Sequence, residues 1–301
     1  MCLGVQFGLA AYAHGVGRKR DRPDETPQTR LSDGRIARVA PSEITSGFEV
    51  DVDGTPQSHV DLADPTHLHF EYVARMGAVI DQLPDGPLTA VHLGAGGLTI
   101  PRYIAAARPG SRQQVIELEQ PLVDLVREHL PLPRGASIRM RIGDAREGLG
   151  RLPSALRGAV DLLVSDVYSG AQTPAHLTTV EFYSACAEML AASGVLLVNA
   201  ADGAGLAFAR RQVATIREVL PEVAVLAEVQ VLKGRRFGNL VIAASAQPLP
   251  VEWLPRLMAA GPHPAKVAHG DEIERFVAGA RPARDGDATD SPKPSLKLFE
   301  R

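Results

Sequence analysis

Residues 89–120 read TAVHLGAGGLTIPRYIAAARPGSRQQVIELEQ, and this stretch decides the fold class. The apolar run at 89–93 predicts a buried strand, and the glycines that follow it predict a tight turn. The next apolar run predicts a helix near 98–107, and a second apolar strand follows at 113–118. A strand, a helix and a strand in this order form the βαβ unit of a parallel sheet that is covered on both faces.

The same alternation continues toward the C-terminus. Apolar runs predict further strands at 136–142, 160–165, 194–199, 223–231 and 239–245, with helices near 121–130, 178–192 and 204–219. The hairpin-sized stretch LKGRRFG, residues 232–238, joins the last two strands and predicts an antiparallel pair at the end of the sheet. The sequence therefore predicts an α/β fold with a Rossmann-like sheet over residues 83–248. Ligands of such sheets bind at the carboxyl ends of the strands.

The flanks of this domain differ from it in pattern. Short alternating runs with DG and DP turns predict a small antiparallel β unit with a linking helix over 32–82. A helical extension is expected over 249–280. Residues 1–31 end in the polar stretch RKRDRPDETPQTRL, and residues 281–301 are similar to it. Neither stretch has a hydrophobic period, so 1–31 and 281–301 are both predicted to be disordered tails.

Composition excludes several classes of protein. The formal net charge is −3, and no basic stripe marks a nucleic-acid interface. No apolar run reaches the ~18 residues of a membrane span. Two cysteines, at positions 2 and 186, form no disulfide framework, so we expect a reducing, cytoplasmic compartment. The pair His67 and His69 has no third ligand at a recognisable spacing, so no metal site is expected.

Candidate ligand contacts follow the first two strands. Gly94 and Gly96 form a G-x-G turn, which lets a ligand approach the helix N-terminus, although a plain tight turn would also use these glycines. Glu117 lies about 20 residues further on, the spacing of a carboxylate that accepts hydrogen bonds from both hydroxyls of a ribose. The alternative for Glu117 is a solvated acid at a strand end.

Acidic residues also follow the third and fourth strands. Asp144, beside Ala145, can accept a hydrogen bond from an adenine amine, and it is also a favoured helix N-cap. Asp166 ends a buried strand, where it is a candidate general base or a contact for a substrate amine, unless the loop only caps a helix. Three acids at successive strand ends beside a glycine loop together indicate an adenosyl pocket. The chain has no G-x-x-x-x-G-K-[ST] loop, which argues against a phosphate-transfer site. It has no G-x-S-x-G elbow, which argues against a serine hydrolase.

Three further stretches resemble the spermidine synthase family, the polyamine aminopropyltransferases. Residues 53–57 read DGTPQ and resemble the family's D-G-x-x-Q. Residues 69–71 read HFE, where the family has Tyr, His or Gln, and then Glu. Residues 174–183 read PAHLTTVEFY and resemble the family's G-P-A-x-x-L-x-T-x-E-F-Y, which follows its catalytic strand. The resemblance spans about residues 44–246.

This resemblance implies a sheet of the S-adenosylmethionine-dependent methyltransferase type behind a β-stranded N-terminal unit, in a homodimer. It implies decarboxylated S-adenosylmethionine or S-adenosylmethionine as co-substrate, a small amine as acceptor, and no metal. The catalytic residue it implies is Asp166. The nucleoside contacts it implies, with the glycine turn included, are Gly94, Gly96, Glu117, Asp144, Ala145 and Pro174. The substrate contacts it implies are Gln57, Tyr168 and Ser169.

The chain departs from the family at three positions. Gly97 stands where the family has the Asp that meets the aminopropyl ammonium, Ser169 replaces the second Asp of D-x-x-D, and Phe70 replaces a His or Gln. Aminopropyl transfer to an amine such as putrescine is the main hypothesis. The alternatives are a methyltransferase-like enzyme with a non-polyamine acceptor and a non-catalytic adenosyl-binding protein. Arg102 could attract the carboxylate of an intact donor, but a solvated surface charge is the preferred interpretation.

Overall fold

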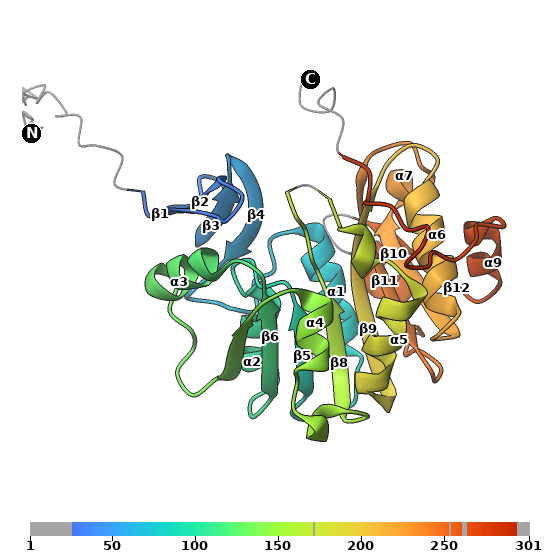
Figure 1. The fold of residues 1–301 in the computed structure, drawn as a ribbon, viewed down its shortest axis with the longest axis horizontal. Coiled ribbons are helices and arrows are strands. Elements are labelled where there is room, and N and C mark those ends of the chain that lie inside the picture. The colour runs from blue at the N-terminus through green and yellow to red at the C-terminus, as the bar shows by residue number, and fades with distance from the viewer. Residues whose placement is uncertain (1–25, 171, 253, 261–263, 294–301) are drawn as a thin grey trace, which may run out of the picture.

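The computed structural model describes residues 26–293, except Ala171, Trp253 and residues 261–263. Its N-terminal part is a four-stranded antiparallel sheet in the order β1-β2-β3-β4 (Figure 1). The strands are β1 Gln28–Arg30, β2 Ile36–Pro41, β3 Phe48–Val52 and β4 Thr55–Val60. Alternate residues along β2, Ala37 and Val39, are buried, as the period-two pattern predicts for a sheet with one covered face.

The second sheet has eight strands in the order β12-β10-β11-β9-β8-β5-β6-β7. The strands β9, β8, β5, β6 and β7 pair with one another in parallel. The pairs β11–β9, β10–β11 and β10–β12 are antiparallel. The strands are β5 Thr89–Leu93, β6 Arg112–Glu117, β7 Ser137–Ile142, β8 Val160–Ser165, β9 Leu190–Asp202, β10 Glu222–Glu228, β11 Gly238–Ser245 and β12 Ala265–His269. The α/β class, the parallel part and the antiparallel pair are confirmed.

Helices cover both faces of this sheet (Figure 1). One face carries α1 Glu71–Asp81, α2 Thr99–Ala107 and α8 Leu254–Ala260, and the other carries α4 Ala145–Gly150, α5 Val180–Met189, α6 Ala207–Arg217 and α9 Asp271–Val277. The neighbours Leu162 and Leu163 of β8 pack into opposite cores, which explains why the parallel strands read as continuous apolar runs. Helix α3 Gln120–His129 packs against the N-terminal sheet, and α7 Val229–Leu232 follows β10.

Several boundaries differ from the expectations. The strand expected over 223–231 ends at Glu228, where α7 begins, and the extension over 249–280 includes β12 as well as helices. The prediction of a disordered tail over 1–31 was wrong for residues 28–31, because Gln28–Arg30 form β1 and Leu31 is buried. The tail expected over 281–301 was wrong for 281–293, where Ser291 is fully buried. Residues 1–25 and 294–301 lie outside the described residues.

Within the described ranges, no helix combines the length and the apolar character needed to cross a membrane.

Candidate active site

A cavity of about 800 Å³ lies between the two sheets, at the carboxyl ends of β5, β6, β7 and β8. Its wall includes residues from β3 and β4 and from the loops that follow the parallel strands. The structure brings all ten candidate residues to this one wall. They are Gln57, Gly94, Gly96, Glu117, Asp144, Ala145, Asp166, Tyr168, Ser169 and Pro174.

The glycine turn after β5 is shaped by close contacts within the protein. Gly94 has a φ of +86°, and a Cβ placed there would lie 2.2 Å from the backbone oxygen of Asp166. Gly96 has a φ of +47°, and its Cβ would lie 2.4 Å from Ser58 Oγ. Only glycine adopts these conformations at little cost. The turn therefore brings the ends of β5 and β8 together and seats the loop against β4.

Glu117 ends β6 with its carboxylate directed to the glycine turn. Oε2 accepts a hydrogen bond from the backbone N–H of Ala95 at 2.7 Å, and Oε1 accepts one from the N–H of Glu119 at 3.0 Å. Burial raises the pKa of Glu117, and these backbone donors oppose that rise. Each oxygen of a carboxylate has two lone pairs, so both oxygens can accept one further hydrogen bond from a ligand.

Asp144 is the N-cap of α4. Its Oδ1 accepts hydrogen bonds from the backbone N–H groups of Arg146 at 2.9 Å and Glu147 at 3.1 Å, which confirms the capping role. Its Oδ2 lies 2.8 Å from His176 Nε2. Burial alone would raise the pKa of Asp144, but the hydrogen bonds from His176 and the backbone hold it below its usual value. The residue is therefore an ionised acceptor at the cavity wall.

Asp166, directly after β8, is held by two neutral donors. Asn199 Nδ2 donates to Oδ1 at 2.9 Å, and the hydroxyl of Tyr72 donates to Oδ2 at 3.2 Å. Burial raises the pKa of Asp166, and the two hydrogen bonds limit the rise. Burial and the charge of Asp166 raise the pKa of Tyr72, so this hydroxyl remains protonated. No cation among the described residues acts on the pKa of Asp166.

Sequence reasoning missed three of these polar neighbours. Asn199 lies in β9, at the end of the strand expected over 194–199, so the strand-end rule could have found it. His176 lies in the polar stretch after β8, but no spacing signals its contact with Asp144. Tyr72 comes from α1, and nothing local indicates that this helix reaches the end of β8.

The remaining candidates also line the cavity. Burial raises the pKa of Tyr168 well above its usual range, so its hydroxyl remains protonated. The backbone N–H of Ser169 donates to the carbonyl of Gln172 at 2.8 Å, and Gln57 Nε2 donates to the carbonyl of Thr55 at 3.2 Å. Pro174 precedes a short 3-10 turn, Ala175–Leu177.

Gly97 lies beneath the N-terminal sheet. Its N–H donates to Ser58 Oγ at 2.9 Å, and a Cβ there would lie 2.8 Å from Val60 Cγ2 and 3.0 Å from Ser58 Cβ. A side chain at this position therefore requires the side chains of Val60 and Ser58 to shift. Arg102 is only 2% exposed and donates to the carbonyls of Gly97 and Pro131, so the expectation of a solvated charge was wrong.

The substitution Gly97→Asp tests this packing. We expect it to lower the free energy of unfolding by about 1–3 kcal/mol, because a close-packed site is overfilled and a carboxylate is desolvated. Urea unfolding measures the change. Gly150→Asp is the control, because a Cβ at Gly150 meets nothing within 4 Å. A Gly97→Asp variant as stable as the Gly150→Asp control would contradict the packing argument.

His67 and His69 meet a third histidine in space. The His59 ring centroid lies 4.7 Å from that of His69 and 5.7 Å from that of His67. His59 Nε2 is bonded to the carbonyl of Ser46, and His67 Nδ1 lies 3.3 Å from Asp61 Oδ2. In the part of the chain that the structure describes, no group of three or more such ligands is arranged to hold a metal ion.

The comparisons with known proteins agree with this geometry. No protein-family model matches the chain. A crystal structure of a probable spermidine synthase from Corynebacterium glutamicum is 30% identical, with a TM-score of 0.77, and the match covers 89% of this chain and 99% of that one. The chain belongs to the spermidine synthase family. The resemblance drawn from the sequence motifs is therefore confirmed.

Two curated relatives of the family match over shorter lengths. The polyamine aminopropyltransferase of Vibrio vulnificus is 27% identical over 135 residues, which is 44% of this chain and 44% of the relative. That of Chromobacterium violaceum is 27% identical over 186 residues, which is 60% of this chain and 66% of the relative. The chain thus spans less than two thirds of the length of each curated relative that it matches.

Proposed function

We propose that this chain transfers an aminopropyl group from decarboxylated S-adenosylmethionine to a small amine. The observation that carries the proposal is Asp166, a carboxylate with neutral partners that shares a cavity with Glu117 and Asp144. The names of the relatives support it, because both curated relatives are polyamine aminopropyltransferases. The proposal assigns the protein to polyamine biosynthesis, in the cytoplasm and as a homodimer.

The nucleoside half of the donor fits the residues on β6 and β7. Glu117 would accept hydrogen bonds from the ribose hydroxyls, since both its oxygens keep a free lone pair. Asp144 would accept one from the adenine amine, and the N–H of Ala145 would meet a ring nitrogen. Pro174 would line the same pocket. These contacts depend on the adenosyl group alone, so any adenosyl ligand would use them.

The chemistry requires a base and a positioned pair of reactants. The amine nitrogen forms a bond to the methylene carbon next to the sulfonium, the C–S bond breaks, and its electron pair neutralises the sulfur as a thioether. The proton lost by the amine passes to Asp166, whose pKa is raised by burial and so suits a proton acceptor. Holding the amine and the sulfonium in line can supply much of the rate.

The chain lacks two carboxylates of the family pattern, one for each substrate. Gly97 replaces the Asp that meets the aminopropyl ammonium of the donor, and Ser169 replaces an acid that contacts the amine acceptor. The cavity wall on the acceptor side includes Gln57 and Tyr168. We therefore expect putrescine to compete poorly against primary amines that carry a single charge.

Calorimetric titration separates the donor hypotheses. The ligands are decarboxylated S-adenosylmethionine, S-adenosylmethionine and methylthioadenosine. A preference of about tenfold or more for the decarboxylated donor, about 1.4 kcal/mol, supports aminopropyl transfer. A preference of about tenfold or more for S-adenosylmethionine over its decarboxylated form would instead support a methyltransferase-like enzyme. Binding of none of the three would overturn both.

Glu117→Gln tests the nucleoside contacts. We expect the affinity for all three ligands to fall by about tenfold or more, because hydrogen bonds to a charged acceptor contribute about 1.5–3 kcal/mol. The loss should be equal across the ligands, since the ribose is common to them. Glu128→Gln, on the exposed surface of α3, is the control. A loss confined to one donor would show that Glu117 contacts some other part of it.

A further inference from the structure

The proposed reaction uses no residue of the C-terminal strap, by which we mean residues 282–293. The strap follows α9 and returns across α6 and α5 to the loop after β8 (Figure 1). Its polar composition predicts a disordered tail, yet Ala283 is 1% exposed and Ser291 is fully buried. Three sets of contacts hold it in this place.

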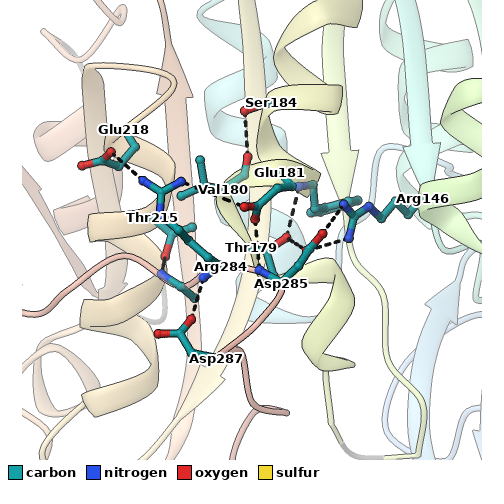
Figure 2. Close-up of polar contacts among 12 residues, drawn as sticks. Arg146, Thr179, Val180, Glu181, Ser184, Thr215, Glu218, Arg284, Asp285 and Asp287 are labelled. Carbon is teal, nitrogen blue, oxygen red and sulfur yellow. Dashed lines mark hydrogen bonds and ion pairs between the residues drawn. The ribbon is translucent and has the colours of Figure 1, made fainter.

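The first set fixes the start of the strap to two helices. The N–H of Ala283 donates to Thr215 Oγ1 at 2.9 Å, and its carbonyl accepts from the N–H of Val180 at 2.9 Å. The guanidinium of Arg284 lies 3.5 Å from Glu218 (Figure 2). Because Thr215 belongs to α6 and Val180 begins α5, this end of the strap is anchored to the core of the catalytic domain.

The second set links the strap to the proposed adenine contacts. Both oxygens of Asp285 accept hydrogen bonds from Arg146, each at 2.8 Å, and Oδ1 also accepts one from Thr179 Oγ1 at 2.8 Å (Figure 2). These bonds lower the pKa of Asp285 to about 2. A bidentate pair of arginine and carboxylate fixes both side chains in one geometry. Arg146 directly follows Asp144 and Ala145, so the strap holds the helix start that carries them.

The third set binds the loop on both sides of Pro174. The N–H of Thr173 donates to Ser291 Oγ at 2.8 Å, and the N–H of Ala175 donates to Asp290 Oδ1 at 2.8 Å. The N–H of Ser291 donates to the carbonyl of Thr173 at 3.0 Å. Backbone groups of a loop need such partners when they leave water. The strap thus provides the hydrogen bonds that fix Pro174 in the wall of the cavity.

We infer that Asp285, Asp290 and Ser291 are positioning residues for the adenosyl donor, acting through Arg146 and the loop residues 172–179. The inference rests on the proposed function for the identity of the ligand. The strap contacts the proposed adenine pocket on two sides. One side is the start of α4, and the other is the backbone around Pro174. A pocket that is fixed before the ligand arrives loses less entropy when the ligand binds. The strap therefore sets donor affinity and leaves the proton transfer to Asp166.

The test compares Asp290→Ala and Ser291→Ala with the control Asp287→Asn. Asp287 lies in the same strap and pairs with Arg211 at 2.8 Å, away from the loop. In the two test variants, hydrogen exchange of the Ala175 and Thr173 amides should speed up about tenfold or more, as expected when a local hydrogen bond is removed. The affinity for methylthioadenosine should fall about five- to tenfold, with kcat at saturating donor within about twofold of wild type.

A double-mutant cycle examines the second set of contacts. Arg146→Gln, Asp285→Asn and the double variant should each weaken methylthioadenosine binding, and the double variant should lose no more than the worse single variant. Melting temperatures of all variants are compared, so that a loss of affinity is separated from a loss of stability.

The outcomes are distinct. Unchanged exchange in the Asp290→Ala and Ser291→Ala variants overturns the inference, as does an equal loss of affinity in the Asp287→Asn control. A fall in kcat with unchanged affinity also overturns it. If the wild type binds no adenosyl ligand, the proposed function fails, and the donor part of this inference fails with it. The exchange measurement then still decides whether the strap orders the loop.

Discussion

Asp166→Asn is expected to lower kcat by at least about 10²-fold, because general-base catalysis contributes roughly 10²–10⁴-fold. The amide keeps the shape of the side chain and one oxygen acceptor, but it cannot take the proton from the attacking amine. The carboxylate accepts hydrogen bonds from Asn199 and Tyr72, and neither lies among the proposed nucleoside contacts. The affinity for methylthioadenosine should therefore stay within about threefold of wild type. Steady-state kinetics and calorimetry measure the two quantities.

The control is Asp161→Asn, near the opposite end of the same strand. Asp161 Oδ2 accepts a hydrogen bond from the N–H of Thr89 at 2.8 Å, and the residue does not line the cavity. The Asp161→Asn variant should retain turnover. A loss of turnover in both Asp161→Asn and Asp166→Asn would therefore indicate damage to β8 and not the loss of a base. Turnover of Asp166→Asn close to the wild-type rate would refute the assignment of Asp166 as catalytic base.

The pH profile gives a second measure of the same group. A base acts in its ionised form, so the rate falls as pH decreases through the pKa of Asp166. Burial raises this pKa, so the acidic limb should lie above the usual range of an aspartate. The limb should be absent from the residual activity of Asp166→Asn. A limb that persists unchanged in that variant belongs to another group.

The ends of the strands could be predicted from the sequence, because each end is marked by a local change from apolar to polar residues. Apolar runs such as 160–165 mark buried parallel strands, and the residue after such a run must lie at the carboxyl edge of the sheet. That geometry alone placed Glu117, Asp144 and Asp166 on one wall. The role of each residue still depends on the ligand, which topology does not determine.

The C-terminal strap could not be predicted because its order comes from partners far away in the chain. Asp285 is held by Arg146, and Ser291 by Thr173, through contacts across more than 100 positions of sequence. Its residues have no hydrophobic period, so composition alone indicates disorder. The same limit applies to Tyr72, whose contact with Asp166 spans 94 positions.

The position of the glycine turn could be predicted from the sequence, but only part of the reason why glycine is needed there could be predicted. Sequence reasoning attributes Gly94 to the approach of a ligand, and a plain tight turn is the alternative. In the structure, Gly94 also allows the backbone of β8 to approach β5, and Asp166 lies at the point of contact. The N–H of Asp166 donates to the carbonyl of Leu93 at 2.9 Å. The position of the proposed base thus depends directly on this glycine.

Gly94→Ala should therefore reduce both stability and turnover. The φ of +86° is unfavourable for alanine, and its Cβ would lie 2.2 Å from the backbone oxygen of Asp166, so the ends of β5 and β8 must separate. We expect the free energy of unfolding to fall by about 3 kcal/mol or more, because a backbone clash adds to the ~1–2 kcal/mol of the left-handed conformation. Turnover should fall further than the folded fraction, since displacing a catalytic group by about 1 Å can cost about 10²-fold. Urea unfolding and assays on the folded protein measure the two effects.

Gly135→Ala separates the two causes. Gly135 has a φ of +79°, close to that of Gly94, but a Cβ there meets nothing within 4 Å. Its substitution should cost only the ~1–2 kcal/mol of the backbone conformation and should leave turnover unchanged. The difference between the variants is then the cost of the contact with Asp166. Equal losses of stability, with turnover retained in both variants, would mean that β8 moves aside without cost and that the position of Asp166 does not depend on the glycine turn.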